Sequence, residues 1–160
     1  MTIALLRVDE RLIHGQVTVG WGSHLKPTRY VVVDDTLAEP GWEQELYSLG
    51  TPAGAVAEFL SVEAARDRVA DLRATTEAVV VLTRDLDHML RLAVGGVLDG
   101  ASVNLGGIHH HEGRKQALPY LFLSDADRDR IRRLLAGGVD VSARELPGSH
   151  RTPAQDLLDD

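Results

Sequence analysis

One short segment near the start of the chain concentrates side chains that can do chemistry. Between Arg7 and His14 the sequence places two arginines, two acids and one histidine within eight positions. A neutral imidazole such as that of His14 has a free lone pair, which can act as a base, a metal ligand or a nucleophile toward phosphorus. Arg11 can offer a planar fork of donors to phosphate oxygens. This combination suits phosphoryl transfer, which needs positioning and charge neutralisation.

The residues that follow His14 favour the same chemistry. Gly15 has no side chain, so other groups can approach the backbone closely there. Gln16 and the next residues to Val19 look like the start of a helix, where free N–H groups and a partial positive charge attract an anion. The segment as a whole therefore predicts an anion site built around His14.

Spacing alone leaves a simpler interpretation open. A single histidine in a loop can be an ordinary surface or capping residue. Arg7 and Arg11 could pair with Asp9 and Glu10 as a solvated network of ions, which has little energetic consequence.

The elements around the segment explain why a site belongs there. Short apolar runs alternate with helical patterns, which predicts an α/β fold with an open three-layer sheet, a mainly parallel core and helices on both faces. Ligands bind such sheets beyond the carboxyl ends of the strands, and the His14 segment directly follows the first predicted strand. The predicted strands are 3–8, 30–33, 55–60, 78–82, 101–105, 120–123 and 139–146, the last as a candidate antiparallel edge strand.

Side chains at the predicted helix starts support this division of the chain. Ser61, Asp85 and Ser124 can each accept hydrogen bonds from the first turn of a helix. Asp34 and Asp35 are expected to end a strand and cap the next helix.

Composition excludes several classes of protein. The chain has 160 residues, a net charge of −7, 4% aromatic residues and no cysteine. The charge and the scarcity of aromatics predict no nucleic-acid partner, and the absence of cysteine excludes disulfides and thiolate chemistry. The apolar runs are too short to span a membrane and no signal peptide is recognisable, so we expect a cytoplasmic protein. Trp21 and Trp42 could be core anchors or partner contacts, and we expect them in the core.

The segment from Arg7 to Val17 resembles the active-site signature of the IIB components of mannose/fructose/sorbose-type sugar phosphotransferase systems, V-R-[IV]-D-[DE]-R-L-I-H-G-Q-V. Further segments resemble the family pattern in the same order, although Leu86 stands where the family often has proline. These segments are 31–35, 51–54, 86–92, 104–107, 113–114 and 146–147. The resemblance implies a IIB domain over residues 1–147, followed by a C-terminal tail over residues 148–160.

The resemblance also implies a function. His14 would accept a phosphoryl group at Nδ1 from a phosphohistidine of a IIA protein and pass it to a sugar bound in the membrane IIC/IID complex. Arg11 would stabilise the group in transfer, and we expect Arg7 and Asp9 to shape the loop or bind phosphate. The resemblance implies a transferase without metal or other cofactor, held at the inner face of the membrane through IIC/IID, and the family allows a homo-oligomer.

The sequence leaves the roles of two further segments undecided, one with glycines and one with histidines. Asn104, Gly106 and Gly107 follow a predicted strand, so their backbone N–H groups could reach phosphate, although a simple tight turn fits equally well. His109–His111 replaces small or aliphatic residues of the family and is expected to be a solvated loop.

Two alternative functions remain at this point. In one, phosphorylated His14 signals to a protein partner without any sugar transport. In the other, His14 and the three adjacent histidines 109–111 serve a metal-dependent hydrolase.

Overall fold

The computed structural model of the chain describes residues 3–159, and its centre is a seven-stranded sheet with the order β3-β2-β4-β1-β5-β8-β9. Neighbouring strands are parallel except for the last pair, β8 and β9. A separate antiparallel pair joins β6 to β7. The strands are β1 (Leu5–Val8), β2 (Arg29–Val33), β3 (Val56–Leu60), β4 (Val79–Thr83), β5 (Ser102–Leu105), β6 (Lys115–Leu118), β7 (Leu121–Leu123), β8 (Asp140–Ala143) and β9 (Thr152–Pro153).

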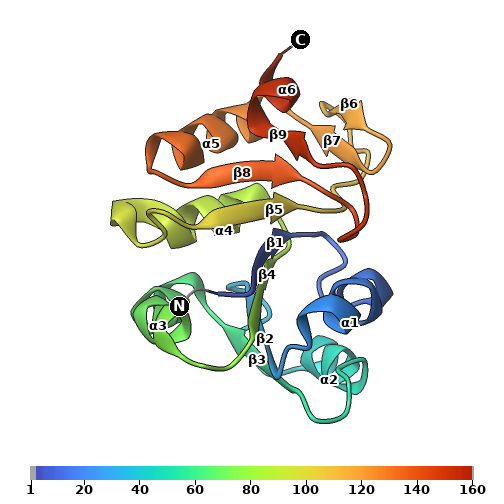
Figure 1. Cartoon of the computed structure of the whole chain (residues 1–160), viewed down its shortest axis with the longest axis vertical. Helices are drawn as coiled ribbons and strands as arrows, with labels where there is room; N and C mark the ends of the chain where they lie inside the picture. Colours follow the sequence, from blue (N-terminus) through green and yellow to red (C-terminus); the bar gives the residue numbers. More distant parts are fainter. Residues whose placement is uncertain (1–2, 160) are drawn as a thin grey trace.

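Helices cover the sheet on both sides (Figure 1), which confirms the predicted three-layer α/β fold. None of the helices within residues 3–159 is long and apolar enough to cross a membrane. The helices are η1 (Gln16–Trp21), α1 (Gly22–Leu25), α2 (Trp42–Leu49), α3 (Val62–Ala74), α4 (Leu86–Ala93), η2 (Val94–Gly96), α5 (Asp125–Ala136) and α6 (Ala154–Leu158).

Two apolar clusters join these layers. All five residues of β4 are buried, and successive side chains point to opposite faces of the sheet. Val79 and Val81 belong to the cluster beneath α3, α4 and α5. Val80 and Leu82 belong to the cluster that contains residues of η1 and of the loop before it. The His14 loop is therefore anchored on the second face of the sheet.

The predicted helix starts are confirmed. Ser61 accepts a hydrogen bond from the N–H of the third residue of α3, and Asp85 does the same for α4. Ser124 forms a reciprocal capping box with Asp127 at the start of α5. The expectation that Asp34 and Asp35 cap the next helix along the chain is wrong. Asp34 accepts hydrogen bonds within the turn after β2, and Asp35 accepts from the first N–H of the more distant helix α3.

The predictions at the C-terminal side of the sheet need correction. The expected edge strand over 139–146 is shorter, and as β8 it lies inside the sheet, parallel to β5. The antiparallel edge strand is β9, which comes from the segment expected as a tail. α6 follows it, with Ala154 and Leu157 buried in the main core. A two-residue strand that ends in proline gives no periodicity by which it could be recognised.

Two further expectations fail. The run 120–123 contributes β7, which pairs with β6 and lies outside the main sheet. Trp42 is 72% exposed at the start of α2, whereas Trp21 is buried as expected. A tryptophan in a helix can lie in the core or on the surface, depending on whether its side of the helix faces the core or the solvent.

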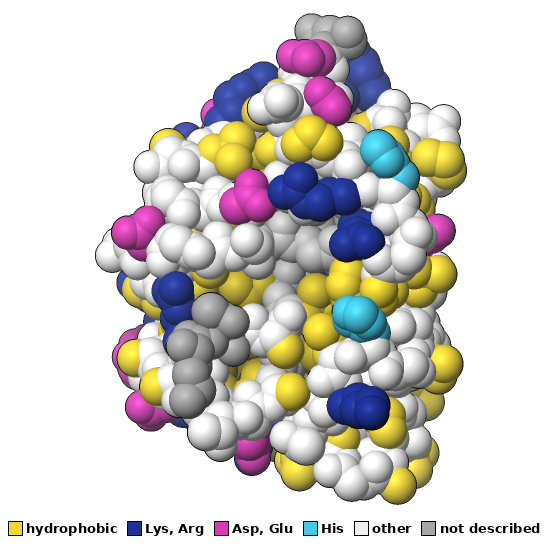
Figure 2. All heavy atoms as spheres, viewed as in Figure 1, with side chains coloured by type: hydrophobic (Ala, Val, Ile, Leu, Met, Phe, Trp, Pro, Cys, Tyr) yellow, Lys and Arg dark blue, Asp and Glu magenta, His cyan; other side chains and the backbone are white. Residues whose placement is uncertain are grey.

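The parallel order brings the segments that follow β1, β4, β5 and β8 to one edge of the sheet. Val8 pairs with Thr83 of β4 on one side and with Leu105 of β5 on the other. Histidine and several basic side chains gather on the side to which the arrows of β5 and β8 point in Figure 1, and acidic side chains lie mainly elsewhere on the same view (Figure 2). The candidate functional site lies at this edge.

Candidate phosphoryl-transfer site

A buried ion pair lies beneath the His14 loop. The side chains of Arg7 and Asp9 are both 0% exposed, and Arg7 Nη2 lies 3.1 Å from Asp9 Oδ2. Arg7 Nη1 donates to Asn104 Oδ1 at 2.6 Å and to the carbonyl of Arg144 at 3.0 Å. The guanidinium also lies 5.7 Å from the ring centre of Trp21, within the range of a cation–π contact. The interpretation of Arg7 as part of a solvated network is therefore wrong.

Asp9 organises the loop through its two carboxylate oxygens. Oδ1 accepts from the backbone N–H and Nε of Arg11, at 3.0 and 3.3 Å. Oδ2 accepts from the N–H of Gly107 at 3.2 Å. Burial raises the pKa of the Asp9 carboxyl, but the hydrogen bond with His14 and the charge of Arg7 lower it more strongly, so that the pKa ends well below its usual value. Asp9 is therefore a permanent negative charge at neutral pH.

His14 contacts this charge through one ring nitrogen. Its Nε2 lies 3.1 Å from Asp9 Oδ2, and its side chain is 16% exposed. An ionised carboxylate can only accept a hydrogen bond, so Nε2 carries the hydrogen. In the neutral ring the lone pair is then on Nδ1. The geometry thus leaves Nδ1 as the ring nitrogen that is free to bind another group.

Arg11 is the more accessible of the two arginines. Its side chain is 38% exposed, and Nη2 donates to Gln16 Oε1 at 2.8 Å. Gln16 therefore holds the guanidinium over the start of η1. Gly15 is exposed, and a Cβ added to it would meet nothing within 4 Å. Arg11, Gln16 and Gly15 thus form the outer, accessible part of the site.

The backbone fixes the direction of the loop. Leu12 is fully buried and has a φ of 55°, a left-handed conformation that a leucine rarely adopts. The carbonyl of His14 accepts from the N–H groups of Val17 and Thr18, which starts η1. η1 is a π-helix, a form that occurs often at functional sites. The predicted helix after His14 is confirmed, with this difference in winding.

The loop after β5 supports the ion pair. Gly106 is required because a Cβ there would overlap the guanidinium of Arg7. Asn104 orients that guanidinium, and the N–H of Gly107 is directed to Asp9. The structure therefore brings all three residues to the site, where they contact Arg7 and Asp9.

The histidines 109–111 take a different position. His109 Nδ1 lies 3.1 Å from Glu10 Oε2, and Arg114 Nη1 lies 2.6 Å from the other oxygen of the same carboxylate. All three histidines are exposed, as expected. Within residues 3–159 they do not form, with or without His14, a close set of metal-ligating atoms. In the part of the chain that the structure describes, His14 and the three histidines 109–111 therefore do not form the metal site that the hydrolase alternative needs.

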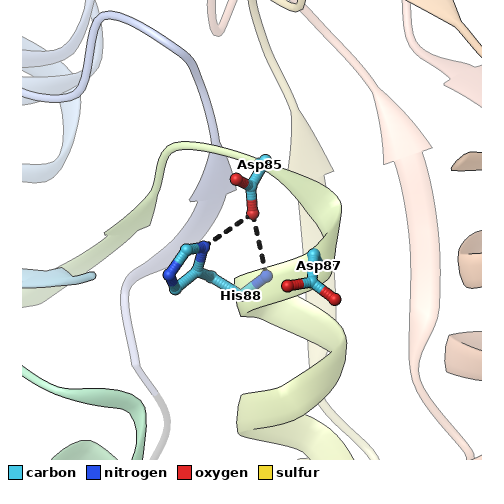
Figure 3. Close-up of side chains that lie close together, drawn as sticks. All are labelled: Asp85, Asp87 and His88. Atoms are coloured by element: carbon cyan, nitrogen blue, oxygen red, sulfur yellow. Dashed lines mark hydrogen bonds and ion pairs between the residues drawn. The ribbon is translucent and has the colours of Figure 1, made fainter. Parts of the chain in front are cut away.

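One close set of ligating side chains does occur in the described part of the chain, formed by Asp85, Asp87 and His88 (Figure 3). Asp85 Oδ1 accepts from the backbone N–H of His88 at 2.9 Å and contacts its Nδ1 at 2.8 Å. Helix capping accounts for this geometry.

Two contributors were missed from the sequence. The carbonyl of Arg144 accepts from both Arg7 and Asn104. Trp21 lies in the core as expected, and in addition its Nε1 donates to the carbonyl of Glu145 and its ring lies near Arg7. The position of Arg144 just after a parallel strand was the available signal, because such positions meet at one edge.

Several known proteins are similar to this chain over nearly its whole length. The family model described as "PTS system sorbose subfamily IIB component" matches residues 3–160. The N-acetylgalactosamine-specific phosphotransferase enzyme IIB component 1 of Escherichia coli is 31% identical over 155 residues, covering 96% of this chain and 97% of that protein. The mannose-specific EIIAB component of Escherichia coli is 28% identical over 158 residues, and the chain spans 49% of its length.

A solved structure has the same fold over the same length. The IIBSor domain of the sorbose permease from Klebsiella pneumoniae superimposes with a TM-score of 0.87 at 26% identity, covering 99% of this chain and 96% of that one. The chain therefore belongs to the sorbose subfamily of phosphotransferase-system IIB components.

Proposed function

We propose that the chain is a phosphocarrier in which His14 takes a phosphoryl group from a phosphohistidine of a IIA protein and passes it to a sugar bound by membrane IIC and IID subunits. The observation that carries the proposal is the contact of His14 Nε2 with buried Asp9, which leaves Nδ1 as the nucleophile. Membership of the IIB family, whose components act as phosphotransferases in sugar transport, supports the same assignment.

The first transfer follows from this arrangement. The Nδ1 lone pair of His14 attacks phosphorus, the P–N bond of the donor breaks, and its electron pair returns to the donor imidazole. Because Nε2 keeps its hydrogen, the phosphorylated ring is positively charged, and the Asp9 carboxylate 3.1 Å away balances that charge. Arg11 neutralises the phosphoryl oxygens, in line with its exposed guanidinium.

The second transfer reverses the roles. A sugar hydroxyl attacks phosphorus, the Nδ1–P bond breaks, and the electron pair returns to Nδ1 to restore the neutral ring. The hydroxyl proton is taken by a base outside this chain. Both transfers need only orientation and charge balance, which a rigid, buried Arg7–Asp9 pair supplies.

The relatives support the choice of partners. One is named an EIIAB component, twice the length matched here, which fits a IIA protein as donor. Others are named for N-acetylgalactosamine, mannose and sorbose. Sugars of such different shapes on one shared fold support selectivity outside the IIB domain.

The test is a reconstituted relay from phosphoenolpyruvate through IIA to membranes that contain IIC and IID, with N-acetylgalactosamine, mannose and sorbose as acceptors. We expect sugar phosphate with the natural chain, none with His14→Gln, and an unchanged yield with His24→Gln, a substitution of an exposed histidine in α1. Undiminished sugar phosphorylation by His14→Gln would contradict the proposal. Phosphorylation of His14 without transfer to any sugar would favour the regulatory function instead.

A further inference from the structure

Arg84 is a cation at the carboxyl end of β4, near the His14 loop, and it has no role in the two transfers proposed above. It directly follows Thr83, which pairs with Val8, and the N–H of Asp9 donates to the carbonyl of Thr83 at 2.9 Å. Arg84 and Asp9 therefore stand side by side at the ends of two strands that lie about 4.8 Å apart.

The side chain of Arg84 leaves the sheet on the face that carries the His14 loop. Side chains alternate along a strand, and Val80 and Leu82 of β4 pack in the same cluster as Ile13 and Val17. Arg84 continues that alternation. It thus shares the face on which Asp9 contacts His14.

The present contacts of Arg84 are weak for an arginine. Its Nε lies 3.8 Å from Asp34 Oδ2 and its Nη2 lies 3.5 Å from Glu43 Oε2, both longer than an ordinary hydrogen bond. Within residues 3–159, Nε of Arg84 is the one buried side-chain nitrogen or oxygen without a hydrogen-bond partner. Native proteins satisfy nearly all such groups, so an unsatisfied one calls for a functional explanation.

The oxygens of a phosphoryl group on His14 would be acceptors for the free Nε donor of Arg84. Asp9 contacts Arg7, Arg11 and His14, and Arg7 is fully buried, so Arg11 is the one guanidinium among these contacts that is accessible to a phosphoryl group. Such a group carries a charge of about −1.5 to −2 near neutral pH. A second accessible guanidinium beside Asp9 would add hydrogen-bond donors for the phosphoryl oxygens.

We propose that Arg84 is an additional phosphoryl-binding residue, which leaves Asp34 and Glu43 when His14 is phosphorylated and donates hydrogen bonds to the phosphoryl oxygens. The proposal rests on the proposed function, because the ligand of Arg84 is the phosphoryl group on His14. Glu43 and Asp34 hold the guanidinium in the unphosphorylated chain and compete with that ligand.

The test compares Arg84→Gln with Arg91→Gln. The control removes a similarly exposed arginine that has a closer ion pair, 2.7 Å from Asp35. With a phosphorylated IIA protein as donor, we expect Arg84→Gln to lower kcat for phosphorylation of His14 about 10- to 100-fold with KM nearly unchanged. Arg91→Gln should stay within about twofold on both. Arg84→Lys keeps the charge but not the fork of donors, so it should recover part of the loss.

A spectroscopic readout separates ligand binding from a structural role. The Nε–H resonance of Arg84 should shift when His14 is phosphorylated in the natural chain, and the ³¹P resonance of phosphohistidine should differ between Arg84→Gln and Arg91→Gln. Glu43→Gln should transfer at least as fast as the natural chain, because it removes a competitor.

The possible failures are distinguishable. A natural chain that is not phosphorylated on His14 would overturn the proposed function and the role of Arg84 together. Normal phosphorylation of the natural chain with equal behaviour of the two variants would overturn only the role of Arg84. A rise in KM alone would make Arg84 a docking residue and would likewise overturn the inference.

Discussion

Replacement of Asp9 by asparagine tests how much of the fold depends on the charge beneath His14. Asparagine keeps the size of the side chain but cannot balance the guanidinium of Arg7, which is 0% exposed. Removal of one partner from a buried ion pair costs about 3–5 kcal/mol, because the other charge stays buried. Arg7 retains acceptors in Asn104 and the Arg144 carbonyl, so we expect the lower end of that range.

A loss of about 3 kcal/mol corresponds to a fall in melting temperature of roughly 6–12 °C for a domain of this size. Urea unfolding followed by fluorescence measures it well, since Trp21 is buried 5.7 Å from the guanidinium of Arg7. The double variant Arg7→Met, Asp9→Asn removes both charges. It should be more stable than the sum of the two single losses predicts, by about 1–3 kcal/mol.

Either of two results would contradict an energetic coupling between Arg7 and Asp9. Asp9→Asn could lose less than about 1 kcal/mol, a loss too small for a stranded buried charge. Alternatively, the two single losses could add fully in the double variant, which would mean that the two side chains are not energetically coupled.

Three further predictions concern the close approach of Gly106 to Arg7, the charge of Asp9 and the burial of the two tryptophans. Gly106→Ala should lose about 1–3 kcal/mol on urea unfolding because its Cβ overlaps Arg7, whereas Gly148→Ala, with open space around it, should change little; equal losses would contradict the close approach. The pKa of Asp9 is lower in the folded chain than its unfolded value of about 4. The stability that the Asp9 charge contributes is therefore complete above about pH 4 and is lost as the pH falls below it. Unfolding free energies measured from pH 5 to pH 3 should fall more steeply for the natural chain than for Asp9→Asn, and parallel curves would exclude this pH dependence of Asp9. Trp42→Ser should leave the unfolding free energy within about 0.5 kcal/mol, whereas Trp21→Ala should lose about 3 kcal/mol or more; the opposite order would mean that the exposures are reversed.

Local chemistry explains what could be predicted from the sequence. The N-caps at Ser61, Asp85 and Ser124 depend on a side chain and on N–H groups two or three residues away, so they are readable without the fold. The buried strand β4 is likewise visible as a continuous apolar run. The candidate site at His14 could be predicted because His14 follows the first strand, and ligands bind parallel sheets beyond the carboxyl ends of the strands.

The features that could not be predicted from the sequence depend on packing between residues far apart along the chain. Whether Arg7 is buried or solvated is decided by Asn104 and Gly106, almost a hundred residues away. The segment 148–160, expected to be a tail, contributes to the fold, because β9 pairs with β8 and Leu157 packs in the main core. Neither feature has a periodic pattern in the sequence by which it could be predicted. The loose contacts of Arg84 are visible only once Asp34 and Glu43 are placed beside it.

The central claim is that Nδ1 of His14 accepts the phosphoryl group. The most direct measurement is ³¹P and ¹⁵N NMR of the chain after incubation with a phosphorylated IIA protein, with the modified residue located by mass spectrometry. We predict one acid-labile phosphohistidine, substituted at Nδ1 of His14, and no incorporation in His14→Gln. Phosphate on Nε2 of His14 or on another residue, or undiminished incorporation in His14→Gln, would contradict the account.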